Sequence, residues 1–532
     1  MKKYIIPFIA ALMSLGMASC TADYVWRNTN EEQASNEDLT HDGNLAGSYI
    51  SQMISNVLPS YQNDGENEYG SASYQVVQGL TGNIFANYEA ASNSGFHQTN
   101  EYNLIADGWT KALFEDAFVR AIAPWTELNA FRSENPQAAA WADILKVAAL
   151  HRVTDAYGPI PYSQIGTGAE HLEYDSQQEV YNGMFKDLDS AIEILTKFVK
   201  DLDGEPFMGR FDNVFYGDMK KWVQFANTLR LRLALRVAYV APTLYNQQAE
   251  AALANELGLL EEDAKLHPGT AKWENPLYVI EYNFNDGDAK AGATIITYMN
   301  GYSDPRRSAY FTAGDDGNYY GVRMGATVDS NYPKSTKWSR IRCTNNDPLL
   351  WMSGAESFFL KAEHYLRQNN TAQAKIAYED GVRKSFEIWG VSIGSYLSTT
   401  KGVGSYTDPV TSGNSWSTAL TGTSVMWTSQ SSTEGHLEQI ITQKYLAMFP
   451  EGMEAWAEFR RTGYPKVIPT ATNNSNGSID SNIQIRRLIY PASEAQANNA
   501  NLQEGIQLLD EEAALGSGDK GGTSVWWDKK AK

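Results

Sequence analysis

Apolar residues recur at helical spacing over much of this chain. Between residues 45 and 58, for example, they fall at every third or fourth position, and Pro59 ends the run. The stretches with the same pattern further along are 109–158, 176–200, 218–240, 349–368, 372–389, 437–461 and a last helix that ends at Leu515. The spacing therefore predicts a mainly α-helical protein, with a helical scaffold over residues 43–265, 349–389 and 434–515.

Two long segments interrupt the helices. Residues 266–348 are dense in Gly, Asn, Asp and Tyr, and short alternating runs such as 277–282 suit loops with a few short strands. Residues 390–433 are rich in Ser, Thr and Gly. Loops on a rigid scaffold commonly carry binding residues, so we expect these insertions to form the ligand face of a single domain over residues 43–532. The polar, aromatic-rich segment 61–109 has the same character.

The helix pair at 349–368 and 372–389 has a repeat-like pattern. Large and small residues alternate at the offsets of a tetratricopeptide repeat, although Lys361 replaces the usual Leu. The six positions are Phe358, Ala362, Tyr365, Ala374, Tyr378 and Gly381. Small residues let two antiparallel helices approach closely while the aromatic rings fill the groove between them. Together with the earlier helix pairs, this motif predicts a tetratricopeptide-like helical-repeat scaffold.

The first twenty residues predict export and lipid anchoring. Lys2 and Lys3 precede a short apolar run, and Cys20 follows small residues at the expected cleavage point. The run is too short to span a bilayer, which takes about 20 apolar residues. The sequence therefore predicts a lipoprotein signal peptide over residues 1–19, lipidation of Cys20, and a polar tether over residues 20–42. A plain secretory signal with an incidental cysteine is the alternative.

Composition narrows the classes of function. A net charge of −20 argues against binding to the phosphate backbone of a nucleic acid. Cys343 is the one cysteine besides Cys20, so a lipidated chain has no intrachain disulfide. With 42% hydrophobic residues, the chain can bury a sizeable core, and we expect packing to supply its stability. The rest of the sequence also contains no apolar run long enough to cross a membrane.

Motifs for catalysis and for metal binding are weak. Residues 390–394 spell GxSxG, but a helix precedes them where the nucleophile elbow needs a strand. Residues 516–521 spell GxGxxG without a βαβ unit around them, and the acidic turns at 286–288 and 315–317 miss the EF-hand spacing. The seven histidines show no HExxH motif. We expect no catalytic residue, cofactor or metal, although carboxylate pairs for glycoside hydrolysis remain open among 63 acidic residues.

Short motifs that span nearly the whole mature chain resemble, in order, those of the SusD/RagB family of nutrient-binding outer-membrane lipoproteins, in its SusD-like subgroup. No single motif is diagnostic, but the ordered set is. The matching stretches are the lipobox at Cys20, 154–162 (TDAYGPIPY), 227–234 (NTLRLRLA), 304–307 (DPRR), 355–363 (AESFFLKAE), 443–445 (QKY) through Trp456, 460–465 (RRTGYP), 490–491 (YP) and 526–528 (WWD).

The resemblance implies a fold and a role. It implies a SusD-like helical domain on the outer face of the outer membrane, held by its N-terminal lipid. Such a protein captures an oligosaccharide and delivers it to a SusC-like TonB-dependent barrel transporter, on which the helical repeats would pack. An oligopeptide ligand remains open. So do the roles of a lipid-anchored glycoside hydrolase or peptidase and of a purely structural assembly factor.

Aromatic residues of the loops are the candidates for ligand binding. Trp and Tyr rings stack on the apolar face of a sugar while polar side chains bind its hydroxyl groups. The candidates are Tyr88, Phe96, His97, Tyr102, Trp109, Tyr298, Tyr302, Tyr319, Tyr320 and Trp338. Most aromatic residues in any chain belong to the core, so we expect only a minority of the ten to contact the ligand. A peptide would be able to use the same aromatic walls.

Overall fold

The computed structural model describes residues 43–58, 62–63, 73–93, 95–269, 272–284 and 287–530. The predicted signal peptide, the tether and Cys20 lie outside the described residues, as do Asp286 and the side chain of His97. The chain divides into two compact units, Met1–Ser48 and Tyr49–Lys532. All contacts described below lie within the second unit.

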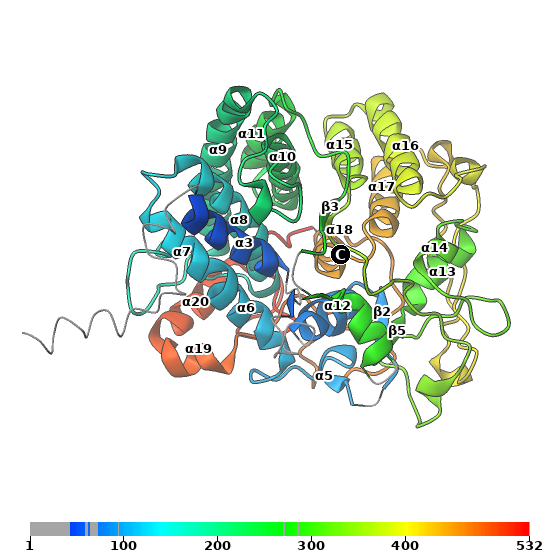
Figure 1. Cartoon of the computed structure of the whole chain (residues 1–532). Helices are drawn as coiled ribbons and strands as arrows, with labels where there is room; N and C mark the ends of the chain where they lie inside the picture. Colours follow the sequence, from blue (N-terminus) through cyan, green and yellow to red (C-terminus); the bar gives the residue numbers. More distant parts are fainter. Residues whose placement is uncertain are drawn as a thin grey trace, which may run out of the picture. The chain divides into compact units, whose positions relative to one another are not determined.

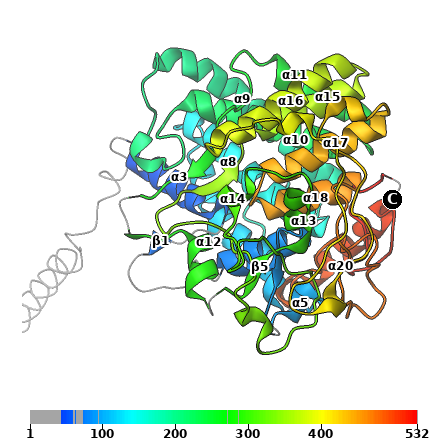
Figure 2. The ribbon, with the colours of Figure 1, turned by 90° about the vertical axis from the view of Figure 1, so that its right-hand side faces the viewer.

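Long helices form the scaffold of this unit (Figure 1). Consecutive helices pack against each other in the first half of the chain. These are α8 (Pro136–Tyr157), α9 (Gln177–Leu202), α10 (Met219–Arg236) and α11 (Pro242–Ala254). In the second half, α15 (Glu356–Arg367), α16 (Thr371–Ile388) and α17 (Thr433–Ala447) lie side by side, and α18 (Gly452–Thr462) follows (Figure 2). The prediction of a mainly α-helical, tetratricopeptide-like scaffold is confirmed.

Further helices complete the described part of the chain. The α-helices among them are α3 (Asn44–Val57), α5 (His97–Asn100), α6 (Ala112–Asp116), α7 (Ala123–Ala130), α12 (Pro276–Tyr278), α13 (Ala293–Gly301), α14 (Arg307–Tyr310), α19 (Ala492–Ala497) and α20 (Asn499–Glu512). The π-helical turns are η2 (Gln75–Asn83), η4 (Ala117–Ile122) and η6 (Val279–Asn283). The 3₁₀ turns are η3 (Trp109–Lys111), η5 (Gly209–Phe211), η7 (Tyr332–Lys334), η8 (Tyr396–Ser398), η9 (Ser412–Asn414) and η10 (Trp427–Ser429).

Local sequence explains where the long helices begin and end. Pro136 opens α8, where the missing N–H costs nothing, and Gly158 ends it with a φ of 89° that favours glycine. A capping box opens α9, because the hydroxyl of Ser176 accepts from the N–H of Glu179 and the Glu179 carboxylate accepts from the N–H of Ser176. The carboxylate of Asp218 caps α10 by accepting from the backbone N–H of Lys221 at 3.2 Å.

The repeat-like pair α15 and α16 packs closely at Gly381. The ring that faces this glycine belongs to Phe359, one position after the predicted Phe358. A Cβ atom on Gly381 would lie 3.0 to 3.1 Å from atoms of the Phe359 ring, so glycine permits this close approach. Phe359 is fully buried. The predicted partner Phe358 is instead half-buried, with the ammonium group of Lys361 4.3 Å from its ring centroid. The replacement of Leu by Lys361 thus lies on the outer side of the helix pair.

Among the described residues, three short antiparallel strand pairs join segments that are distant in sequence. They are β1 (Gln62–Asn63) with β4 (Lys272–Trp273), β2 (Glu89–Ala91) with β5 (Ala289–Ala291), and β3 (Ala264–Leu266) with β6 (Leu349–Met352). In the second pair, Glu89 lies opposite Ala291 and Ala91 lies opposite Ala289. Two of the pairs join the segment 266–348 to residues 62–63 and 89–91, and the third joins the two ends of the segment to each other.

The two insertions pack on each other. The hydroxyl of Tyr406 donates to the carbonyl of Gly321 at 2.7 Å, and the hydroxyl of Tyr332 donates to Asp408 at 2.5 Å. Arg323 donates to the carbonyl of Ser415 at 3.0 Å. Because these bonds join residues 321–332 to residues 406–415, the two insertions form one continuous body.

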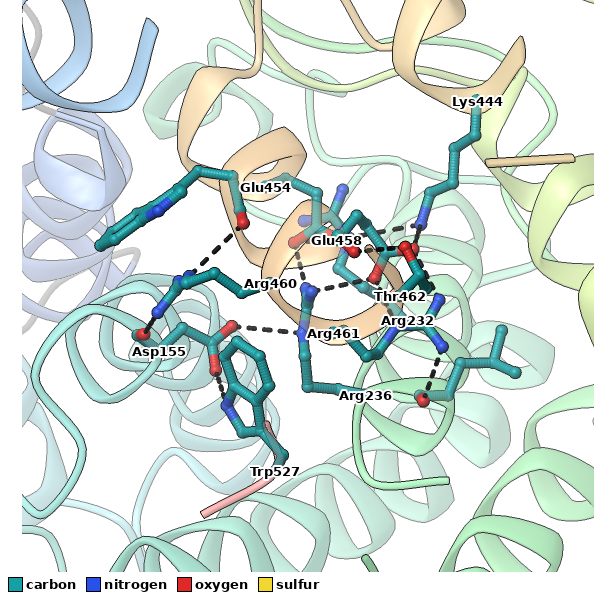
Figure 3. Close-up of polar contacts among 12 residues, drawn as sticks. Asp155, Arg232, Arg236, Lys444, Glu454, Glu458, Arg460, Arg461, Thr462 and Trp527 are labelled. Atoms are coloured by element: carbon teal, nitrogen blue, oxygen red, sulfur yellow. Dashed lines mark hydrogen bonds and ion pairs between the residues drawn. The ribbon is translucent and has the colours of Figure 1, made fainter. Parts of the chain in front are cut away.

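A network of buried ion pairs lies where α8, α10, α15, α17 and α18 meet (Figure 3). Arg236 on α10 pairs with Glu454 at 2.5 Å and with Glu458 at 2.9 Å on α18. Lys444 on α17 lies 3.3 Å from Glu458, and Arg461 pairs with Glu458 at 2.7 Å. All of these side chains are buried. The network therefore holds helices from both halves of the scaffold together.

The motifs behind the family resemblance supply this network. Arg232, from NTLRLRLA, pairs with Glu356, from AESFFLKAE. Glu363, from the same motif, pairs with Arg461 of RRTGYP at 2.6 Å. The other members from these motifs are Asp155, Lys444, Arg460 and Trp527. The charges that meet in this network thus serve the fold, and the ligand face must be sought among other residues.

A buried histidine beside this network makes stability depend on pH. Burial lowers the pKa of His151 to about 3, and the nearby charge of Arg232 acts in the same direction. Between about pH 3 and pH 6.5, the unfolded chain therefore binds a proton at this position that the folded chain does not. Stability from His151 is present above pH 6.5 and falls as the pH falls, by about 1.4 kcal/mol per pH unit.

His151→Gln is expected to flatten the pH dependence of the free energy of unfolding. The variant has no group at position 151 that takes up this proton, so the difference between variant and wild type should change by about 1.4 kcal/mol per unit between pH 4 and pH 6. Urea denaturation at a series of pH values measures it. Parallel curves for the two proteins would show that His151 is not held neutral in the folded state.

Candidate ligand-binding face

Five of the ten predicted aromatic residues are buried in the core. Their exposed fractions are 0% for Tyr88, 1% for Tyr102, 0% for Tyr298, 2% for Tyr302 and 4% for Trp338. The hydroxyl of Tyr298 donates to the carbonyl of Lys466 at 3.0 Å, and that of Tyr302 donates to the carbonyl of Thr423 at 2.8 Å. The expectation of a surface position is wrong for these five residues, because their rings pack inward and their polar atoms find partners there.

Four of the predicted residues remain partly open to solvent. Phe96, Trp109, Tyr319 and Tyr320 are half-buried, which leaves part of each ring available to a ligand. His97 begins α5, and its side chain is outside the described part of the structure. For these five residues, ligand contact stays a prediction.

Tyr319 lies in a small cluster with groups from α13 and α14. The guanidinium carbon of Arg307 lies 4.4 Å from the centroid of the Tyr319 ring. The same guanidinium donates to the side-chain oxygen of Asn300 at 2.5 Å, and the Asn300 amide donates to the carbonyl of Tyr319 at 3.0 Å. Asn300 is exposed. The cluster thus combines an oriented ring with a cation and an amide, which are the groups that bind a sugar ring and its hydroxyls.

Tyr320 lies in a second cluster with Asp316 and Lys337. Its hydroxyl donates to the Asp316 carboxylate at 3.3 Å, and the ammonium of Lys337 donates to the same carboxylate at 2.8 Å. The hydrogen bond from Lys337 lowers the pKa of Asp316 to about 2, so Asp316 is a carboxylate at neutral pH. An exposed carboxylate accepts hydrogen bonds from hydroxyl groups. Since consecutive residues of an extended segment point to opposite sides, Tyr319 and Tyr320 serve two separate patches.

A third patch consists of a pair of rings in the first aromatic segment. The ring centroids of Phe96 and Trp109 lie 5.1 Å apart at an angle of 55°. The side chain of Gln98 accepts from the backbone N–H of Trp109 at 3.1 Å and so fixes the start of η3. This pair comes from a segment that precedes the long helices, while the other two patches belong to the insertion 266–348.

The structure adds three residues to the candidates for ligand contact. Arg307 and Asn300 were not among the candidates, because nothing in the sequence shows that they lie beside Tyr319. Trp416 is half-buried, and the guanidinium of Arg323 lies 5.2 Å from its ring centroid. Trp416 could have been chosen from the sequence, because it lies in a segment rich in Ser, Thr and Gly.

The described residues hold no group of three or more His, Cys, Asp or Glu side chains that fits a metal ion. In the acidic turn at 315–317, both carboxylates lie near the ammonium of Lys337, at 3.5 Å from Asp315 and 2.8 Å from Asp316. Asp288 of the other acidic turn accepts from the amide of Gln75 at 2.7 Å. Across the same residues, none of the helices has the length and apolar character needed to cross a bilayer.

Comparison with known proteins identifies the family. The model of the SusD-like family, described as SusD and RagB outer membrane lipoprotein, matches residues 27–528. The chain belongs to the SusD-like family. The members of this family are outer-membrane lipoproteins that act as binding proteins rather than enzymes. None of the curated proteins matches the chain in sequence.

Solved SusD-like structures superpose on nearly the whole unit. A chitin-binding SusD homologue from Flavobacterium johnsoniae is 33% identical, with a TM-score of 0.83 over 92% of this chain and 99% of that one. A SusD homologue from Bacteroides uniformis ATCC 8492 is 38% identical, with a TM-score of 0.78 over 91% and 99%. One from Bacteroides thetaiotaomicron VPI-5482 is 35% identical, with a TM-score of 0.80 over the same shares. The chain therefore has the complete SusD-like fold.

Proposed function

We propose that this SusD-like protein captures an oligosaccharide at the cell surface and delivers it to a SusC-like TonB-dependent barrel transporter. The observation that best supports a sugar ligand is the cluster around Tyr319. There a partly open ring, a guanidinium 4.4 Å from it and an exposed amide combine the stacking surface and the hydrogen-bonding groups that a sugar requires. The description of a relative of 33% identity as chitin-binding supports a glycan ligand.

The lipid anchor is part of this proposal. Lipidation of Cys20 would hold the protein on the outer membrane, and the polar tether 20–42 would leave the folded unit free to meet both ligand and transporter. The helical repeats would pack on the barrel, while the insertions 266–348 and 390–433 would face the ligand. The mutual packing of these insertions supports such a division, since it makes them one rigid surface.

We also propose that the protein binds its ligand without cleaving it. A glycoside hydrolase needs one carboxyl group that is protonated near neutral pH beside the bound sugar. On the exposed face, hydrogen bonds from Thr336 and Lys337 lower the pKa values of Asp315 and Asp316, so both are carboxylates. Ser392 of the GxSxG string follows helix α16 instead of a strand.

Glu89 and Glu281 do not provide the missing acid catalyst. Burial raises the pKa values of Glu89 and Glu281, and the charge of Glu281 raises that of Glu89 further. The cavity that they line has a volume of about 10 Å³. This is room for about one water molecule, which excludes a sugar ring from these carboxyl groups.

Tyr319→Ala is expected to weaken oligosaccharide binding by about tenfold, because the loss of a stacked ring costs about 1.4 kcal/mol. Calorimetric titration of the mature chain with chitin oligosaccharides and with pools of other glycans measures the effect. Phe131→Ala is the matched control, since Phe131 is 37% exposed and lies at the end of α7 on the scaffold. Equal affinities for Tyr319→Ala and wild type, or an equal loss in the control, would contradict this assignment.

A further inference from the structure

A cavity of about 250 Å³ lies apart from the three aromatic patches. Its walls come from the strand pair β3–β6, the segment 341–348, the end of α16 and the junction between α17 and α18. None of Phe96, Trp109, Tyr319, Tyr320 and Trp416 lines it. It is therefore a different location from the candidate ligand-binding face.

One side of this cavity is apolar. Leu277, Leu349, Phe449 and Pro450 are among the residues that line it. The half-buried ring of Trp389 joins them, and contact with Tyr310 fixes this ring at a centroid distance of 4.4 Å. Fixed rings and aliphatic side chains of this kind pack against the C–H face of a small cyclic molecule.

Among the described residues that line the cavity, one cationic side chain has no hydrogen-bond or ion-pair partner. Lys265 pairs with Asp263 at 2.8 Å, and Asp263 also accepts from the N–H of Gly354. The carboxylate of Asp347 accepts from the hydroxyl of Thr344 at 2.6 Å. By contrast, the guanidinium of Arg342 is exposed at the rim and has no hydrogen-bond or ion-pair partner among the described residues. Its backbone N–H donates to the carbonyl of Tyr310 at 2.8 Å.

We propose that this cavity is a second ligand site, which takes one carboxylated sugar ring of hexuronate size with its carboxylate on Arg342. The inference rests on the proposed function, because it assigns a further glycan subsite to a glycan-binding protein. A planar guanidinium binds a carboxylate through two parallel hydrogen bonds, which gives both strength and orientation. The apolar wall at Trp389 and Phe449 then receives the ring.

The cavity is large enough for a sugar ring. About 10–15 Å³ of such volume holds one water molecule, so about 250 Å³ has room for some twenty. This space holds one six-membered ring with its substituents. A single acidic residue, free or at the end of a longer glycan, therefore fits the cavity.

The site is tested with glucuronate and galacturonate as probes and with glucose and acetate as references. The protein is the mature chain with Cys20→Ser, in which Cys343 is the remaining thiol. Cys343 lines the cavity, and burial raises its pKa, so it reacts slowly with iodoacetamide. We expect a uronate to bind in calorimetry and to slow the alkylation of Cys343 further. Glucose and acetate should do neither at the same concentration, because each lacks either the carboxylate or the ring.

Arg342→Gln removes the charge and keeps a side chain of similar length. We expect it to weaken uronate binding by about tenfold or more, since hydrogen bonds to charged groups are the strong ones. The matched control is Arg383→Gln, because Arg383 is exposed on α16 and pairs along its own helix, with Glu379 and Asp380. The control should bind the uronate as the wild type does.

The outcomes separate this inference from the proposed function. Equal binding of acetate and uronate, or unchanged affinity in Arg342→Gln, would overturn the second site and leave a nonspecific anion contact. If chitin oligosaccharides bind while no uronate binds, the second site fails and the proposed function stands. If no glycan of any kind binds the wild-type chain, both fail. Loss of uronate binding in Arg342→Gln with Cys343 protection in the wild type would establish the site.

Discussion

Glu458→Gln is expected to lower the free energy of unfolding by about 3–5 kcal/mol, which is the usual cost of breaking a buried ion pair. Glu458 is 2% exposed and is shared by three cations of the network in Figure 3. Its carboxylate accepts from Arg236 at 2.9 Å and from Arg461 at 2.7 Å, and it lies 3.3 Å from the ammonium of Lys444. Glutamine keeps the size of the side chain and removes the charge that these cations share.

The electrostatics of Glu458 explain the size of this effect. Burial by itself would raise the pKa of Glu458, but Arg461, Lys444 and Arg236 hold it well below its usual range. The folded state therefore contains an ionised carboxylate whose removal leaves positive charges without compensation in a dry interior. A single substitution at this position weakens the contacts among α10, α17 and α18 together.

Urea denaturation of the mature chain at neutral pH measures the loss. The matched control is Glu387→Gln on α16, because Glu387 is exposed and pairs with Lys384 at 2.9 Å. Exposed pairs contribute about 0–1 kcal/mol, so the control should stay close to the wild type. Similar midpoints for Glu458→Gln and Glu387→Gln would show that the buried network does not hold the scaffold together.

Trp527→Ala is expected to lower the free energy of unfolding by about 3–5 kcal/mol, the usual range for Trp→Ala in a core. Trp527 lies five residues before the C-terminus and is fully buried. Its indole N–H donates to Asp155 at 2.8 Å. The guanidinium groups of Arg236 and Arg460 lie 5.4 and 4.8 Å from its ring centroid, so the C-terminal segment closes one side of the ion-pair network.

Trp527→Phe separates the contribution of ring packing to stability from that of the hydrogen bond to Asp155. Phenylalanine fills much of the same volume but cannot donate to Asp155, which keeps its hydrogen bond from Tyr181. We expect a loss of about 1–2 kcal/mol, well below that of the alanine variant. Denaturant titration of the two variants in parallel provides the comparison. Unchanged stability in Trp527→Ala would mean that residues 525–528 are not part of the folded core.

The helices were predictable because their periodicity is local. How deeply each face of a helix is buried was not predictable. The stripe on 218–240 predicted α10, and its apolar residues off that stripe indicated burial on two sides. The sequence does not show that Arg232 and Arg236 point into the interior, since their partners Glu356 and Glu454 lie more than a hundred residues away. The spacing of residues along one helix does not show which charged residues will pair when they are far apart in sequence.

The candidate face was predictable only in part for a related reason. Tyr298 and Tyr319 both belong to the same polar, aromatic-rich insertion, yet one is buried and the other is half-buried. Tyr298 is drawn inward by the carbonyl of Lys466, which is 168 residues away in sequence. Composition identifies a segment rich in aromatic residues, and tertiary contacts decide which of its rings remain open. In the same way, the repeat pattern predicted Phe358 as the packed ring of the α15–α16 pair, whereas the adjacent Phe359 packs against Gly381.

Titration of the mature chain with chitin oligosaccharides and other glycan pools, with chromatography of the sugars afterwards, tests most directly whether this SusD-like protein holds a glycan and leaves it intact. We predict saturable binding that weakens in Tyr319→Ala, with every oligosaccharide recovered at its original length. Shortened products formed at enzymatic rates, or binding of peptides with none of any glycan, would contradict it.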